Sequence, residues 1–347
     1  MKTILGIESS CDETAAAVVV NGSEVLSSIV SSQVDTHAKF GGVVPEVAAR
    51  EHSKSILPVV KLALEESGVG LEEVDAVAVT QGPGLMGALL VGGSFAKGLA
   101  ASTGKPLIPV NHIHAHVHGA FLGLEHEKQK PEFPALSLVV SGGHTNLYYM
   151  ENATDFQLLG ASLDDACGEC LDKVAKLFDL GYPGGPAIEK LAQQGQIGAV
   201  KIPRMMAGRD DCMMSYSGLK THMVYFKQKY PEHDVGLLAD VLSSFQDEAF
   251  LQIIRKVVHA TQCLRESGKK VNSLVVAGGV SANQRFRQLA LEHLPFPSVF
   301  PSLKYCSDNA AMIAALGWHL AHGCTEHEFR KLDWQQFPRY DFNFSNL

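Results

Sequence analysis

The chain has 347 residues, of which 46% are apolar and 19% charged. That length and composition fit a globular protein with material for two domains or one large two-lobed body. No apolar run reaches the roughly eighteen residues of a membrane span, and the net charge of −8 disfavours tight nucleic-acid binding by the chain alone, since such proteins usually carry a basic surplus.

The N-terminal residues form a strand-like run that contains Glu8 and is soon followed by Asp12. This pattern lacks the apolar core and cleavage site of a signal peptide. The seven cysteines are odd in number and lack the spacing of a disulfide framework. We therefore expect a cytoplasmic protein. Cys167 and Cys170 form a C-x-x-C with no second pair, and their place in a predicted helix favours a packing role over a zinc site.

Two segments repeat one strand–turn–strand pattern about 130 residues apart. Apolar runs at 3–9 and 15–20 flank a polar turn, and runs at 136–140 and 146–150 flank a second turn. Such a duplication predicts two similar lobes facing one cleft. Asp12 and Glu13 lie in the first turn, where they could be solvated turn formers or could orient a metal or a nucleophile.

Strands and helices alternate along most of the chain, which predicts an α/β fold. Pro58 should kink or break the first long helix, and the polar stretch 196–222 reads as a long loop or small insertion. Further predicted strands are 74–79, 106–110, 273–277 and 299–301, and the predicted helices include 45–67, 85–103, 117–124, 163–180, 237–265 and one from about 308 to 322.

The segment Asn111–His116 combines a strand end with the start of a helical pattern. Residues four apart on a helix share a face, with Cβ atoms about 5–6 Å apart, so His112 and His116 can direct two imidazoles at one ion. His114 should face elsewhere. Spacing alone is weak evidence, because fifteen histidines make a chance pair common, and surface or core histidines are an alternative.

Asp308 precedes the last predicted helix and allows two interpretations. It could be the helix N-cap, or the third ligand that His112 and His116 lack. Two histidines and one carboxylate leave positions open for substrate oxygens, as in catalytic metal sites.

Glycine-rich turns follow strands at 141–143 and 278–279. Bare backbone N–H groups and a following helix N-terminus can hold a phosphate there without lysine. One such turn is ordinary, but two at related positions of a duplicated fold favour a nucleotide site. Neither matches a Walker or dinucleotide fingerprint.

The chain closely resembles the TsaD family of tRNA N6-adenosine threonylcarbamoyltransferases. The likeness runs from Gly6 to about Gly317 and rests on ten blocks in one order: GIESSCDET (6–14), GGVVPEVAAREH (41–52), QGPGL (81–85), NHIHAH (111–116), VVSGGHT (139–145), DKVAKL (172–177), YPGGP (182–186), SYSGLKT (215–221), VAGGVSAN (276–283) and SDNAAMIA (307–314). The resemblance implies the duplicated, two-lobed α/β fold of acetate kinase, sugar kinases and actin, with a central cleft.

The resemblance also implies an acyltransferase. It would transfer the threonylcarbamoyl group from threonylcarbamoyl-AMP to N6 of the adenosine 3′ to the anticodon, position 37, in tRNAs that read codons beginning with A, and release AMP. By family motif, His112, His116 and Asp308 would hold one divalent metal ion, with iron (Fe2+) expected and zinc as the alternative. Asp12 would lie near the transferred carbonyl. The adenylate would be held by Val139, Val140, Ser141, Gly142, Gly143, Asp172, Gly185 and Asn283.

The family works on tRNA with partner proteins, so we expect a non-catalytic TsaB-like paralogue and a small TsaE-like ATPase, and no membrane. The small-residue helix 85–103 could contact a partner or pack within its own lobe. Basic residues could form a tRNA patch or a solvated loop: Lys201, Arg204, Arg209, Lys220, Lys227 and Lys229. Many members carry Glu where this chain has His114, which leaves both ligand histidines in place.

We predict an N-terminal lobe of residues 1–110, with the tail 324–347 packing back on it, and a C-terminal lobe of residues 111–323 holding the metal and nucleotide sites. Three other functions compete. A small-molecule kinase of the same fold would need a catalytic carboxylate and magnesium but no histidine pair. A metalloprotease would need the absent H-E-x-x-H motif, and a non-catalytic scaffold would have no use for both histidines and Asp308.

Overall fold

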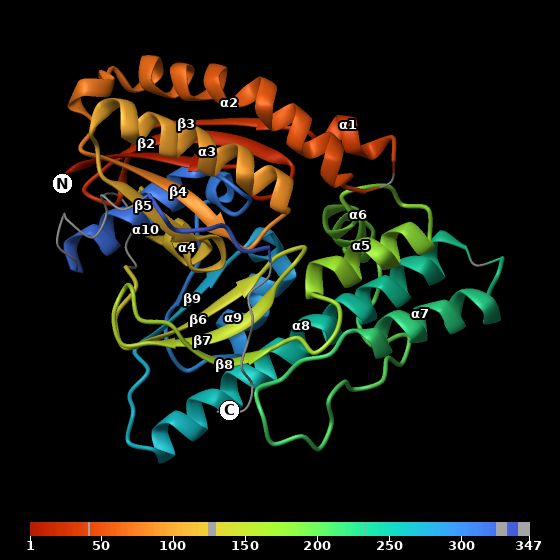
Figure 1. The fold of residues 1–347 in the computed structure, drawn as a ribbon. Coiled ribbons are helices and arrows are strands. Elements are labelled where there is room, and N and C mark those ends of the chain that lie inside the picture. The colour runs from red at the N-terminus through yellow and green to blue at the C-terminus, as the bar shows by residue number, and fades with distance from the viewer. Residues whose placement is uncertain (41, 124–129, 233, 324–331, 339–347) are drawn as a thin grey trace. The chain divides into compact units, whose positions relative to one another are not determined.

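A computed structural model describes residues 1–40, 42–123, 130–232, 234–323 and 332–338. The chain forms two compact units (Figure 1). The first comprises Met1–Lys130 and Pro301–Asn346, and the second comprises Pro131–Phe300. No helix among the described residues is both long and apolar enough to cross a membrane.

The first unit contains a five-stranded mixed sheet in the order β3-β2-β1-β4-β5. Strand β1 pairs antiparallel with β2 and parallel with β4. Its strands are β1 (Thr3–Glu8), β2 (Glu13–Val20), β3 (Glu24–Ser32), β4 (Ala76–Gly82) and β5 (Leu107–Asn111).

The second unit repeats this sheet in the order β8-β7-β6-β9-β10, with the central strand again antiparallel to one neighbour and parallel to the other. Its strands are β6 (Ala135–Val140), β7 (Thr145–Met150), β8 (Gln157–Ala161), β9 (Ser273–Ala277) and β10 (Ser298–Val299). The matching strand orders confirm the duplication predicted from the two strand–turn–strand segments. The predicted cleft stays a prediction.

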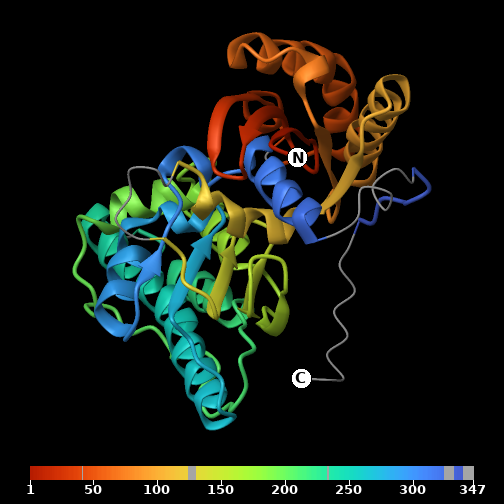
Figure 2. The same ribbon diagram turned by 90° about the vertical axis from the view of Figure 1, so that its left-hand side faces the viewer.

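The central strands of the first sheet are buried on both sides, because helices cover both faces of the sheet. Leu5 and Ile7 of β1 belong to the core formed with α2 and α3, whereas Ile4 belongs to the core formed with α10. Figures 1 and 2 show these helices on opposite faces of the sheet. The helices of this unit are α1 (Val34–Ala38), α2 (Pro45–Ser67), α3 (Met86–Thr103), α4 (His112–His118) and α10 (Ala310–Gly323).

The core of the second unit is built around α8, a helix of 32 residues whose Phe245, Phe250 and Ile253 are fully buried. Leu136 and Leu138 of the central strand β6 join the same core. The helices of this unit are α5 (Cys167–Leu177), α6 (Gly184–Ala192), α7 (Ser217–Lys229), α8 (Val235–Glu266) and α9 (Gln284–His293).

The observed units correct the predicted boundaries at residues 110 and 323. Helices α4 and α10, which we assigned to the C-terminal lobe, belong to the first unit. The reason is packing, since buried residues of α10 form one core with β1, β2 and β5. Of the predicted tail, the described residues 332–338 contact this unit, with Leu332 and Trp334 against its core and Lys97 Nζ donating to the Trp334 carbonyl. Residues 324–331 and 339–347 lie outside the described residues.

Other predictions fail where local pattern is a poor guide. The break expected at Pro58 does not occur, because α2 continues through it while Ile56, Val59 and Val60 pack into the core. Strand β3 was not predicted, because it is an edge strand with a polar, partly exposed sequence. Helix α7 begins at Ser217, inside the predicted loop 196–222.

The close approach of β1 and α10 gives a test of this packing. A Cβ at Gly6 would lie 2.2 Å from the Ala310 carbonyl oxygen, whereas a Cβ at Gly98 on α3 would meet nothing within 4 Å. We expect Gly6→Ala to lower the free energy of unfolding by about 1–3 kcal/mol. Gly98→Ala should raise it by up to about 1 kcal/mol, because alanine favours the helix. Urea denaturation of both variants checks this, and equal effects would contradict the packing.

Candidate functional site

Helix α4 presents the two histidines of the predicted metal pair. It begins directly after β5, and Asn111 caps it, because its Oδ1 accepts hydrogen bonds from the backbone N–H groups of Ile113 and His114. Helix α4 therefore spans His112–His118, so it begins before the predicted segment 117–124 and ends near that segment's start. His112 and His116 lie on one face of it, both buried, with ring centroids 4.6 Å apart.

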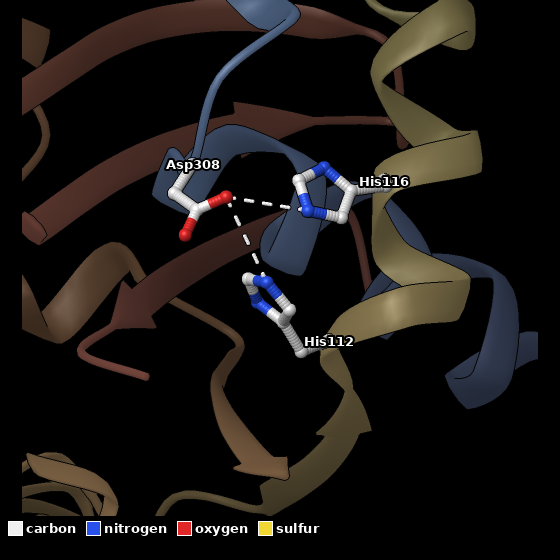
Figure 3. A group of neighbouring side chains, drawn as sticks. All are labelled: His112, His116 and Asp308. Atoms are coloured by element: carbon white, nitrogen blue, oxygen red, sulfur yellow. Dashed lines mark ion pairs between the residues drawn. The ribbon is translucent and has the colours of Figure 1, made fainter. Parts of the chain in front are cut away.

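Asp308 completes a group of three potential metal ligands (Figure 3). Its Oδ1 lies 3.2 Å from Nε2 of His116 and 3.7 Å from Nε2 of His112. Donor atoms held about 2.1 Å from one ion, at tetrahedral or octahedral angles, lie about 3.0–3.5 Å apart. One ligand atom from each of the three side chains lies within 4.8 Å of the others, which is close enough for small shifts to bring all three onto a single ion.

Asn309 excludes one of the two interpretations of Asp308. The N-cap role at α10 belongs to Asn309, whose Oδ1 accepts a hydrogen bond from the Met312 N–H. The Asp308 carboxylate instead points at the two imidazoles in Figure 3. The residue after the predicted cap does the capping and leaves the carboxylate for the site.

The hydrogen bonding of His116 supports a metal at this position. Its ring is 1% exposed, yet among the described residues neither of its nitrogens has a hydrogen-bond partner. Nε2 is close to Asp308 without hydrogen-bond geometry. Because a buried polar atom without a partner costs free energy, a cation among these three donors would satisfy Nε2. Two imidazoles and one carboxylate suit a borderline divalent metal.

Glu8, at the end of β1, is a residue of this site that our sequence reasoning missed. It is fully buried, and its Oε2 lies 3.0 Å from Nδ1 of His112. The signal was available, because Glu8 is an acidic residue in an otherwise apolar strand, and a buried carboxylate needs a partner.

The pKa values of Glu8 and His112 are shifted in opposite directions. Burial raises the pKa of Glu8, but the charge and hydrogen bond of His112 outweigh it and bring the pKa below its ordinary value. Burial lowers the pKa of His112, but the carboxylates of Glu8 and Asp308 raise it to about 9. The site therefore favours a positive charge on or beside His112, and a metal ion must compete with a proton there.

The turn after β1 adds two more acidic groups near Asp308. Asp12 is buried and Glu13 half-buried. Burial, followed by the charges of Asp308 and Asp12, raises the pKa of Glu13 to about 9. Asp12 is outside the three-ligand group, and its predicted role near the reacting carbonyl stays a prediction. The repulsion among these carboxylates is a further reason to expect a cation.

His114 is also outside the ligand group, as its position on the helix predicts. Burial lowers its pKa to about 4, so the imidazole is neutral at pH 7. The imidazole of His114 therefore adds no charge to the site.

The second unit brings the two glycine-rich turns together. A Cβ at Gly278 would lie 2.4 Å from the Val140 carbonyl oxygen and 3.2 Å from the Ser141 nitrogen, and Gly278 has a φ of +87°. By contrast, Cβ atoms at Gly142, Gly143 and Gly279 would meet nothing within 4 Å. The turns at 141–143 and 278–279 are thus neighbours, with open space beside Gly142, Gly143 and Gly279, while Val139 and Val140 are buried in β6.

Asp172 and Asn283, both predicted to hold an adenylate, have structural hydrogen bonds. An Asp172 oxygen accepts from the Gly184 N–H at 2.7 Å, and its carboxylate also accepts from Gly185. Asn283 caps α9 by accepting from the Phe286 N–H, and it donates to Gln246. These side chains hold the N-termini of α6 and α9 in place, which is compatible with a ligand site but does not require one.

The remaining sequence candidates have ordinary surroundings. Cys167 and Cys170 are buried in the core, where burial raises the pKa of Cys167 to about 12, so both remain thiols. Of the predicted basic patch, Arg209 pairs with Asp211, and Lys220 pairs with Asp165. The net positive charge available to RNA there is smaller than the residue list suggests.

If these three side chains are the metal ligands, replacing one of them should weaken metal binding, whereas replacing a neighbouring histidine should not. Replacing His116 with alanine removes one of three ligands, so Zn2+ affinity should fall by more than about 100-fold, since even outer partners of ligands contribute 10–100-fold. His114→Ala, on the same helix, should retain affinity within about threefold. Competition with a chromophoric chelator measures both. Equal losses would contradict the assignment of ligands.

The contact of the two turns predicts different effects at adjacent glycines. Gly278→Ala should lower the free energy of unfolding by about 1–3 kcal/mol, because the methyl group meets Val140 and the positive φ disfavours alanine. Gly279→Ala should change it by less than about 1 kcal/mol. Thermal unfolding of the two variants checks this, and a stable Gly278→Ala protein would show that the turns are not packed together.

The chain is similar in sequence to proteins of one known family. The family model described as TsaD, tRNA N6-adenosine threonylcarbamoyltransferase, matches residues 24–315. A protein of that name from Clostridium beijerinckii is 49% identical over 322 residues, covering 91% of this chain and 92% of its own length. Another, from Symbiobacterium thermophilum, is 49% identical over 329 residues and covers 94% and 93%.

A solved structure of different sequence shares the fold. Component A of the (R)-2-hydroxyglutaryl-CoA dehydratase of Acidaminococcus fermentans has a TM-score of 0.52 at 15% identity, covering 95% of this chain and 100% of its own. With the repeated sheets, this likeness confirms the predicted duplicated α/β fold of the acetate kinase, sugar kinase and actin class.

Proposed function

Because the chain belongs to the tRNA N6-adenosine threonylcarbamoyltransferase family, we propose that it transfers the threonylcarbamoyl group of threonylcarbamoyl-AMP to N6 of adenosine 37 in tRNAs that read codons beginning with A, releasing AMP. The observation that carries this proposal within the structure is the buried His112–His116–Asp308 group.

His112, His116 and Asp308 are the proposed ligands of one divalent ion, with Fe2+ first and Zn2+ as the alternative. Such an ion, when bound, would supply a Lewis acid for an acyl oxygen or for charge on the phosphate. The protein holds these ligands on a capped helix and on the turn before α10, in a buried and acid-rich setting. That setting favours a cation and fixes its position before substrate arrives.

The adenylate is assigned to the second unit. The turn 139–143, with Asp172, Gly185 and Asn283, offers backbone N–H groups and the N-termini of α6 and α9, which suit an anionic phosphate. The open space beside Gly142, Gly143 and Gly279 would let a phosphate approach the backbone. Asp12 is the proposed polar group near the transferred carbonyl.

Partners are part of the proposal. The chain has a net charge of −8, so a high affinity for tRNA would require help from a TsaB-like paralogue and a TsaE-like ATPase. Helix α3 buries Ala88, Gly92 and Ala96 within its own unit but exposes Met86 and Leu90, so one helix can serve both packing and a partner contact. A cytoplasmic location fits a tRNA substrate.

The competing functions are weaker on the same evidence. Kinase chemistry has no use for the buried histidine pair, and a scaffold would not need three aligned metal ligands. The relatives are named as threonylcarbamoyltransferases, which does not favour the kinase.

Reconstitution tests the proposal. Purified protein, partner proteins, ATP, bicarbonate, labelled threonine and unmodified tRNA should give label on the tRNA. We expect Asp308→Asn to lower the rate at least about 100-fold, because it weakens a proposed metal ligand. Asp155→Asn, an exposed change of the same kind, should retain the wild-type rate.

Two results would overturn this function. One is no label with wild-type protein when a related enzyme labels the same tRNA in parallel. The other is a wild-type rate in Asp308→Asn.

A further inference from the structure

Glu8 is the one fully buried carboxylate in contact with a proposed metal ligand among the residues that the structure describes, and it is not itself in the ligand group. We propose that Glu8 is a positioning residue, which accepts a hydrogen bond from Nδ1–H of His112 and so leaves Nε2, the nitrogen on the side of Asp308, to bind the ion. This inference deepens the proposed function and rests on the metal site assigned there.

The contacts determine which nitrogen carries the proton. Nδ1 of His112 lies 3.0 Å from Glu8 Oε2, and Nε2 lies on the side of Asp308, 3.7 Å from its Oδ1. An ionised carboxylate can only accept hydrogen bonds, so Nδ1 must donate. The Ser10 hydroxyl, 3.3 Å from the same Nδ1, can donate or accept and does not select a tautomer.

Glu8 is itself held in place by donors. The Thr80 hydroxyl donates to Oε2 at 2.6 Å, and the Ser10 N–H donates to Oε1. Together with Nδ1 of His112, three donors converge on one buried carboxylate. A glutamine would turn its NH2 group toward at least one of them, and the Ser10 N–H cannot reverse its role.

The duplicated fold shows that strand packing does not require an acid here. Glu8 is the last residue of β1 paired with β2, opposite Ala15. The corresponding last paired residue of β6 is Val140, opposite Thr145. The second unit therefore has an apolar residue at the same position of the strand pairing. The carboxylate in the first unit is not needed for that pairing, and its role is the hydrogen bond to His112.

The experiment measures metal affinity and the histidine proton, apart from transferase activity. With the full chain, Zn2+ affinity of Glu8→Gln is measured by chelator competition, and the Nδ1–H signal of His112 is followed by NMR in the Zn2+-loaded protein. We expect a 10–100-fold weaker affinity and a lost or shifted Nδ1–H signal. Glu46→Gln, an exposed change of the same kind, should alter neither.

Wild-type affinity in Glu8→Gln, or an unchanged Nδ1–H signal, would overturn the proposal. If Glu8→Gln does not fold, Thr80→Val removes one donor to Glu8 at similar volume and should weaken Zn2+ binding about threefold or more, while an unchanged affinity in that variant would equally overturn it. This test is independent of the proposed transferase function. Weaker Zn2+ binding in these variants would support the role of Glu8 even if wild-type protein did not label tRNA.

Discussion

The candidate metal site depends on the packing of α10 against β1. Asp308 immediately precedes α10, and the helix approaches β1 so closely that Gly6 has no room for a Cβ beside the Ala310 carbonyl. Because α4 shares a core with the same helix, this contact brings the carboxylate of residue 308 to histidines almost two hundred positions earlier in the chain. The close packing at Gly6 is thus one of the contacts that bring the three candidate ligands together.

Electrostatics then constrain the same region. Glu8 and Asp308 lie against the imidazoles of His112 and His116, and the charges of Asp308 and Asp12 act on the largely buried Glu13. The protein compensates in part by shifting pKa values, with His112 raised to about 9 and Glu13 to about 9. A bound cation would relieve the repulsion more completely.

The two units show how one architecture supports two kinds of site. In each, the loop that follows the central strand of the sheet carries functional candidates. The first unit places acidic side chains there, next to imidazoles. The second has glycines, with open space for a ligand at the backbone and the turn after β9 packed against it through Gly278. The duplication supplies the framework, and the residues in the turns decide the chemistry.

The sequence by itself determined the strand–turn–strand repeat, most central strands and the i,i+4 histidine pair, because these depend on local periodicity. Its ordered motifs also sufficed to indicate the family. Tertiary structure decided the rest. Residues 111–130 and 301–323 joined the first unit through the packing of α10, which no local pattern encodes, and the edge strand β3 gained its identity only from pairing with β2. Only the folded chain shows that Asn309, and not Asp308, caps α10. Folding also places Glu8 against a histidine 104 residues away, since the spacing of residues does not encode a hydrogen bond of that separation.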